Sequence, residues 1–182
     1  KKFKKLNINE KNNLIVYSYY CCNFNPTEIV KTMFLYNLLD NEAYSYLRTD
    51  KQLGYSVNAS IYNLNEKKYL FITVQSSKDI NYVIKIIDEF IVYFQKFFNK
   101  KINNSNEFNK IKNVIYKLIN LKSNDTYDSF IKYYNEILLE RYFFNKDIIL
   151  TNELNKITKE DMILFNSFVR IISLLKKYNS YK

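Results

Sequence analysis

The apolar and polar positions change period several times along the chain, and each change marks an expected element. Residues 14–22 are β-branched and aromatic and are bounded by asparagines, which is typical of a strand. Residues 55–62 alternate between apolar and polar positions, and residues 69–76 form a similar run after a short polar connection. The short connection favours an antiparallel hairpin. One face of its first strand carries Tyr55, Val57, Ala59 and Ile61.

One helix is expected between the first strand and this hairpin. Asn25 is placed to cap it, Pro26 suits its first position, and Glu28 completes a pair that resembles a capping box. Apolar residues then recur at helical spacing as far as Tyr46, and a break near residues 40–41 is compatible with the pattern. The helix therefore delivers the chain to the segment that begins at Leu47.

The remainder of the chain is expected to be helical. Apolar stripes predict helices over residues 80–98, 108–119 and 127–142, with a polar linker at residues 99–105. We expect all three stripes to be core surfaces, because a stripe at helical spacing is most often buried. The third stripe consists of Tyr127, Phe130, Ile131, Tyr134, Ile137, Leu138 and Tyr142.

A last helix is predicted by a capping box of Thr158 with Asp161. Beyond it, residues 171–175 fit either a continued helix or a final strand. The expected order is β-α-β-β-α-α-α-α, without an internal repeat or a domain-sized linker. We therefore predict one α+β domain over residues 1–182, with a small, mainly antiparallel sheet covered on one face by helices.

The net charge of +10 does not indicate a nucleic-acid-binding surface. Only three of the 28 basic residues are arginine, and the lysines are scattered except near the start of the chain. Asparagine, isoleucine, tyrosine and phenylalanine are abundant while alanine, glycine and proline are scarce, a bias that AT-rich codons would produce. A nucleic-acid module would cluster its charge and use arginine for bidentate contacts. We expect no nucleic-acid partner.

Composition also limits the chemistry of the chain. It contains no histidine, which removes most zinc sites and the dyads in which histidine activates serine or cysteine. Cys21 and Cys22 are adjacent in the first strand, so their side chains are expected on opposite faces, as reduced thiols. This favours a reducing intracellular compartment. No apolar run is long enough to span a membrane, and none resembles a signal peptide.

The stretch Leu47–Tyr55 contains the only glycine of the chain, Gly54. A lone glycine indicates a backbone position with positive φ or a close approach by another chain. Arg48 offers a planar fork for a carbonyl or carboxylate, and Tyr55 offers a phenol hydroxyl. Such donors, held rigidly, orient a peptide or stabilise an oxyanion.

Simpler interpretations of the same residues remain open. Arg48 can form a surface ion pair with Asp50 or Glu42, and Tyr55 can be a packed strand tyrosine. The amide of Gln52 is better suited to stabilising a turn than to acting as a reactive group.

The sequence LRTDKQLGY at residues 47–55 resembles a motif in the C-terminal half of the insulinase-type zinc metallopeptidases, the group of insulysin, pitrilysin and nardilysin. The resemblance continues, in order and spacing, from about residue 13 to residue 168. It includes residues 33–35, 74–76, 132–137 and 157–161. An ordered set of this length is more specific than the nine-residue motif alone.

The resemblance implies the α+β domain type shared by the insulinase and mitochondrial processing peptidase group. The chain would be the last of four homologous domains in a longer polypeptide, a metalloendopeptidase that encloses its peptide substrate. The zinc, and the H-x-x-E-H motif that binds it, would belong to the N-terminal half, so this chain would hold no metal and would be inactive alone. The final segment, RIISLLKKYNSYK, does not clearly supply the terminal strand expected for such a domain.

The resemblance also implies roles for three residues. Arg48 would hold a backbone carbonyl of the substrate, and Tyr55 would support the scissile carbonyl or its oxyanion in the transition state. Gly54 would permit the turn and the close approach of substrate. Two other functions remain open: a non-catalytic homologue that acts as an assembly or peptide-binding subunit, and a basic nucleic-acid module.

Overall fold

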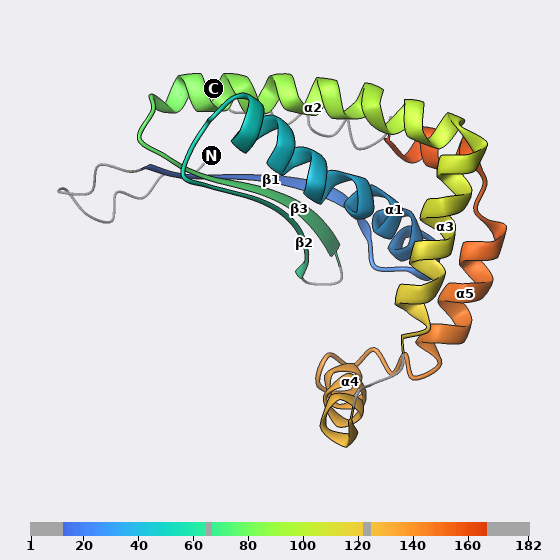
Figure 1. The fold of residues 1–182 in the computed structure, drawn as a ribbon. Coiled ribbons are helices and arrows are strands. Elements are labelled where there is room, and N and C mark those ends of the chain that lie inside the picture. The colour runs from blue at the N-terminus through green and yellow to red at the C-terminus, as the bar shows by residue number, and fades with distance from the viewer. Residues whose placement is uncertain (1–12, 65–66, 122–124, 167–182) are drawn as a thin grey trace.

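The structure is a computed structural model, and it describes residues 13–64, 67–121 and 125–166. Along the chain its elements are β1 (Asn13–Asn23), α1 (Pro26–Ala43), η1 (Tyr44–Asp50), β2 (Ser56–Leu64), β3 (Lys67–Ser76), α2 (Ile80–Asn103), α3 (Ser105–Ile119), α4 (Thr126–Leu138) and α5 (Lys146–Lys156) (Figure 1). Residues 159–166 are also helical. The residues 171–175, for which helix and strand were both open, lie outside the described residues.

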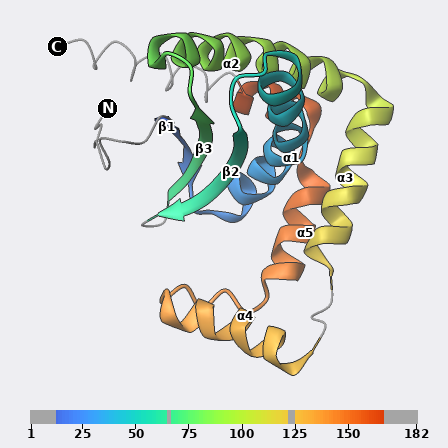
Figure 2. The same cartoon turned by 60° about the vertical axis from the view of Figure 1, so that its left-hand side comes forward.

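The three strands form one antiparallel sheet in the order β1-β3-β2. Along β3, Leu70, Ile72 and Val74 are buried and alternate with partly exposed residues, so only one face of the sheet belongs to the core. Helix α1 lies against the strands on this face and α2 lies beside α1 (Figures 1 and 2). The predicted α+β architecture and the β2–β3 hairpin are confirmed.

The apolar stripe predicted for α2 forms the centre of the core. Val83, Ile87, Phe90 and Phe98 along this helix are almost completely buried. Helix α3 extends the core, since the ring of Phe108 stacks on Phe34 of α1 with 5.4 Å between the ring centroids. Helices α3 and α5 then run side by side away from the sheet (Figures 1 and 2).

The two adjacent cysteines do not point to opposite faces of the sheet, as predicted, because β1 contains a bulge. Tyr20 pairs with Tyr69 and Cys22 pairs with Lys68, so Cys21 is an extra residue between two partners. The extra residue lets both side chains enter the core, where both are buried and neither forms a disulfide. Burial raises the pKa of the Cys22 thiol to about 11.

The structure differs from the expected elements at three points. The break that the sequence left open near residues 40–41 is not formed, and α1 continues to Ala43 and then widens into the π-helix η1. The expected linker at residues 99–105 is reduced to Asn104, whose side chain caps α3. Helix α5 was not predicted, because its apolar residues 148–150 are consecutive and give no helical stripe.

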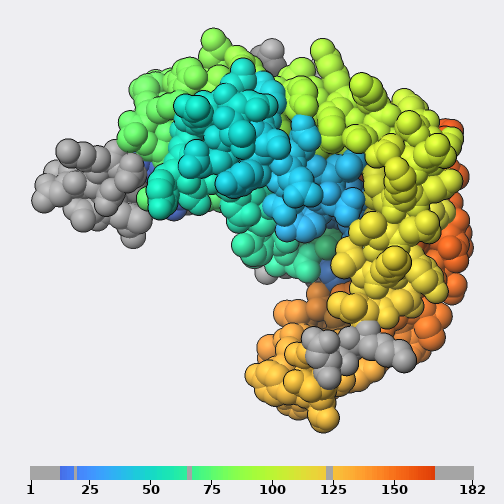
Figure 3. Space-filling model, in the orientation of Figure 1, coloured from blue at the N-terminus to red at the C-terminus, as the bar shows by residue number. Residues whose placement is uncertain are grey.

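The apolar stripe of α4 is exposed, so the prediction that it forms core was wrong. Tyr127 is 69% exposed, Phe130 57% and Leu138 62%, and Glu136 is the buried residue of this helix. Figure 3 shows a hollow between α4 and the part of the molecule formed by α1 and β2. The sequence period identifies a face that favours burial, but the described residues of this chain do not cover it.

None of the helices in the described ranges is both long enough and apolar enough to cross a membrane.

The capping box predicted at Thr158 is confirmed and generates a prediction for the dependence of stability on pH. The Thr158 backbone N–H donates to Asp161 Oδ2 over 3.0 Å, and the Asp161 N–H donates to Thr158 Oγ1 over 3.2 Å. The backbone hydrogen bond from Thr158 lowers the pKa of Asp161. Because the folded-state pKa lies below the unfolded value, the ionised carboxylate stabilises the fold at pH values above the unfolded pKa.

Asp161→Asn is therefore expected to lower the free energy of unfolding at neutral pH, by about 0.5–1 kcal/mol. The difference from the unmodified protein should shrink as the pH falls below about 4 and the carboxyl is protonated. Urea unfolding at neutral and acid pH measures it. A difference that is constant or larger in acid would contradict this account of the cap.

Candidate functional site

The segment that resembles the peptidase motif begins inside η1, a seven-residue π-helix that continues α1. π-Helical turns are rare and are frequent at functional sites. The turn is closed by the N–H of Lys51, which donates to the carbonyl of Tyr46 over 3.0 Å, and by the N–H of Leu53, which donates to the carbonyl of Leu47 over 2.9 Å. Leu47 and Leu53 are both fully buried. Two apolar anchors therefore fix the segment between them.

Aromatic contacts hold η1 against α2. The ring of Tyr46 stacks on Tyr93 with 4.7 Å between centroids and lies 5.5 Å from Phe90. The Tyr93 hydroxyl donates to Glu42 Oε1 over 2.6 Å, and this bond, together with burial, raises the pKa of Tyr93 to about 12. The position of η1 is therefore determined by α1 and α2 together.

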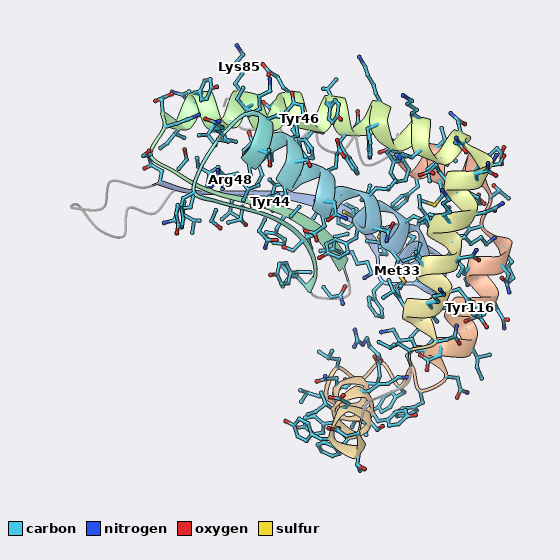
Figure 4. The ribbon with its side chains drawn as sticks, viewed as in Figure 1. Met33, Tyr44, Tyr46, Arg48, Lys85 and Tyr116 are labelled. Atoms are coloured by element: carbon cyan, nitrogen blue, oxygen red, sulfur yellow. The ribbon has the colours of Figure 1, made fainter. Side chains whose placement is uncertain are left out.

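Arg48 extends from η1 on a different side from this aromatic cluster. In Figure 4, Tyr46 points toward α2, whereas Arg48 and Tyr44 point away from it. Within the part of the chain that the structure describes, the guanidinium of Arg48 makes no hydrogen bond and no ion pair. The alternative ion pair with Asp50 or Glu42 is not formed, and Glu42 is instead the acceptor of Tyr93.

Gly54 is required by a close backbone contact. A Cβ atom at this position would lie 2.1 Å from the carbonyl oxygen of Gln75 and 3.2 Å from Ser76 Cβ, at the end of β3. The φ angle of Gly54 is not positive; the left-handed residue of this loop is Gln52, with φ of 46°. Of the two reasons for the lone glycine that the sequence left open, the structure supports the close approach of another strand.

Tyr55 is attached to β3 by its backbone and directs its side chain to solvent. Its N–H donates to the carbonyl of Gln75 over 2.8 Å, while its side chain is 83% exposed. Val57 and Ala59, two and four residues later, are buried on the core face of β2. Tyr55 therefore does not pack with them as an ordinary strand tyrosine, and its hydroxyl is accessible to a ligand.

Two residues that sequence reasoning did not assign also belong to this site. Ser76 Oγ donates to the carbonyl of Leu53 over 2.6 Å and accepts the N–H of Lys78 over 3.1 Å. Lys78 Nζ donates to the carbonyl of Lys51 over 3.3 Å. Only the register of the hairpin, in which Ser56 faces Gln75, shows that the end of β3 meets this loop.

Among the described residues, the site supplies hydrogen-bond donors but no cluster of metal ligands. The chain has no histidine, and the described ranges contain no group of three histidine, cysteine, aspartate or glutamate side chains that could hold a metal ion. Its residues therefore do not fit a zinc site. What the geometry presents is the guanidinium of Arg48 in η1 and the phenol of Tyr55 after the loop that follows, each without a partner from the described residues.

A family model and a curated protein both match this chain, and both are from peptidase-related families. A family model described as PQQ synthase PqqF-like, C-terminal lobe domain 4, matches residues 34–130, slightly more than half of the chain. The insulin-degrading enzyme of Drosophila melanogaster is 29% identical over 134 residues, which are 72% of this chain and 13% of that enzyme.

Two solved structures have the same fold. Pitrilysin matches 87% of the chain with a TM-score of 0.69 and 14% identity. The periplasmic protease PqqL from Escherichia coli matches 87% with a TM-score of 0.63 and 13% identity. The matched region is 17% of the pitrilysin chain and 18% of the PqqL chain, so this chain spans only a small part of the length of these relatives.

The contact at Gly54 predicts a large effect of a small substitution. Gly54→Ala should lower the free energy of unfolding by about 1–3 kcal/mol, because the added methyl group overlaps the backbone of β3. Gln52→Gly is the matched control: at φ of 46° it relieves a left-handed residue and should change stability by less than about 1 kcal/mol. Urea unfolding midpoints measure both. An alanine that is tolerated at position 54 would show that the loop is not packed against β3.

Proposed function

This chain belongs to the PqqF-like C-terminal lobe domain 4 family of insulinase-type metallopeptidases, and from that premise we propose that it is the substrate-enclosing C-terminal domain of a zinc metalloendopeptidase. The observation that carries the proposal is the pair of donors on the two sides of the loop after η1, with Arg48 in η1 and Tyr55 at the far end of the loop. Arg48 has no partner among the described residues, and the side chain of Tyr55 is exposed. Unsatisfied, well-oriented donors are suited to a peptide that arrives from outside the domain.

Arg48 would bind a backbone carbonyl of the substrate. A guanidinium is charged at every physiological pH and presents its donors in a fixed plane, so it can orient an extended peptide. The backbone of Arg48 is held in the π-helix η1. The N–H of Leu53 donates to the carbonyl of Leu47, and the ring of Tyr46 stacks on Tyr93 of α2. The substrate would therefore meet a donor whose backbone does not have to be ordered on binding.

Tyr55 would donate its hydroxyl to the scissile carbonyl, where negative charge develops in the transition state. The N–H of Tyr55 donates to the carbonyl of Gln75, and this bond fixes the Cα atom of Tyr55 at the edge of the sheet. Because Gly54 has no side chain, the backbone before Tyr55 lies close to β3 and no side chain at residue 54 stands beside the phenol. This supports the proposed role of Gly54 in the close approach of substrate. A donor held in this way acts by electrostatic stabilisation.

The metal would be bound by another domain of the same polypeptide. The absence of histidine from this chain supports this division of labour, in which residues 1–182 form one domain that is inactive alone. The partners would be the zinc-bearing N-terminal half and the peptide substrate. The chain spans only 13% of the insulin-degrading enzyme that it matches, which leaves room for such a half in a polypeptide of similar length.

The exposed apolar face of α4 supports the proposal that other domains pack against this one. Phe130 and Tyr134 stack on each other with 5.4 Å between centroids, and both are exposed. Exposed apolar patches of this kind usually mark interaction surfaces. Figure 3 also shows a hollow beside α4.

The role of Tyr55 predicts a specific kinetic defect. Tyr55→Phe in the complete protein should lower kcat for a peptide substrate by about a hundredfold, because one transition-state donor is removed. Zinc content should stay unchanged. Tyr116→Phe is the control, since this exposed tyrosine lies on α3, far from η1 in Figure 4. Normal turnover by the Tyr55 variant would contradict the role, and a complete protein without any zinc motif or activity would favour the non-catalytic homologue.

The role of Arg48 predicts a loss of substrate binding that a second cation partly restores. Arg48→Ala should lower kcat/KM by about tenfold to a hundredfold, the equivalent of one hydrogen bond from a charged group. Arg48→Lys should recover part of the loss, because it retains the charge but not the fork. Lys85→Ala is the control, as Lys85 lies on the outer side of α2 (Figure 4). Equal activity of the Arg48 and Lys85 variants would rule out the contact.

A further inference from the structure

The loop of residues 51–55 is bound on two sides. On one side it is closed onto η1 by the N–H groups of Lys51 and Leu53. On the other side it meets the end of β3, where the N–H of Tyr55 donates to the carbonyl of Gln75. The loop therefore has little freedom, and the bonds at its β3 side determine how far Tyr55 lies from Arg48.

Ser76 is at the centre of the β3 side. It is 1% exposed, and its hydroxyl is used both as a donor, to the carbonyl of Leu53, and as an acceptor, from the N–H of Lys78. A buried hydroxyl that both donates and accepts a hydrogen bond holds its partners more firmly than an exposed hydroxyl does. Breaking either bond would leave a polar group unpaired in the interior. The bonded carbonyl lies only two residues before Tyr55.

Lys78 adds a second bond of the same kind. Its ammonium group donates to the carbonyl of Lys51, three residues after Arg48, and lies 5.5 Å from the ring centroid of Tyr82 at the start of α2. Ser76 and Lys78 thus bind alternate carbonyls of the loop, at Leu53 and Lys51. The contact of Gly54 with Gln75 closes the remaining space between loop and strand.

We propose that Ser76, assisted by Lys78, is a positioning residue of the peptidase site: its hydroxyl fixes the loop so that Tyr55 and Arg48 reach one substrate together. The inference rests on the function proposed above for these two residues. Ser76 touches no substrate and acts through Tyr55. Catalytic donors need placement within a fraction of an ångström, and a displacement of about 1 Å can cost a hundredfold in rate.

A purely structural role for Ser76 makes a different prediction. Ser76→Ala leaves the carbonyl of Leu53 unpaired and would lower stability in either case. If Ser76 acted only through stability, its replacement would reduce activity by the same factor whether or not Tyr55 carried its hydroxyl. If it acts by placing that hydroxyl, the effect must vanish once the hydroxyl is gone.

The test is a double-mutant cycle in the complete protein, with kcat and KM measured for a peptide substrate. Ser76→Ala alone should lower kcat about tenfold or more. In the Tyr55→Phe background the same substitution should lower kcat by less than about twofold, because the two residues act as a unit. Lys78→Met keeps an unbranched side chain that is one heavy atom shorter and lacks the ammonium group. Because residue 78 is less buried than residue 76, this variant should show the same pattern with a smaller factor, and it replaces Ser76→Ala if that variant does not fold.

Thr32→Val is the matched control for loss of a buried hydroxyl. Thr32 is 2% exposed and donates to the carbonyl of Glu28 over 2.6 Å, in the first half of α1 and away from the loop. It should lower stability without changing kcat. Equal factors for Ser76→Ala in both backgrounds would overturn the positioning role while the role of Tyr55 stands. Full activity of Tyr55→Phe would instead overturn the role of Tyr55 and the positioning role with it.

Discussion

The contact between the backbone of Gly54 and the end of β3 is the constraint on which the candidate site depends. A Cβ atom at residue 54 would lie only 2.1 Å from the carbonyl oxygen of Gln75, so the loop can take this position only if the residue has no side chain. This approach brings Tyr55 into pairing distance of Gln75 and the carbonyl of Leu53 into reach of Ser76. The exposed phenol of Tyr55, and the guanidinium of Arg48 that has no partner among the described residues, are presented by a framework anchored in the core at Leu47 and Leu53.

Much of this framework could be predicted from local sequence. The alternation in β2 and β3 and the stripe of α2 report burial directly, and the caps at Asn25 and Thr158 are formed by residues three positions apart. The motif located Arg48, Gly54 and Tyr55 without any structure. The hydrogen bond of Ser76 to the loop could not be predicted in the same way, because it joins residues 23 positions apart.

The wrong predictions have physical reasons. One inserted residue in β1 reversed the expected direction of a cysteine, because the side-chain period of a strand is two. The π-helix η1 was not predicted, although it follows α1 directly. A single wider turn changes the backbone hydrogen bonds, but it leaves too few apolar residues to show a different spacing in the sequence. The stripe of α4 was identified as a face for burial, yet a period contains no information on which partner covers it.

In the proposed function, Arg48 and Tyr55 together bind the peptide at the point of cleavage. The most direct test is a crystal structure of the complete protein with an uncleaved peptide. We expect the Arg48 guanidinium and the Tyr55 hydroxyl each to lie within about 3.2 Å of a substrate carbonyl oxygen, with the Tyr55 contact at the scissile bond. A bound peptide that touches neither side chain would contradict it.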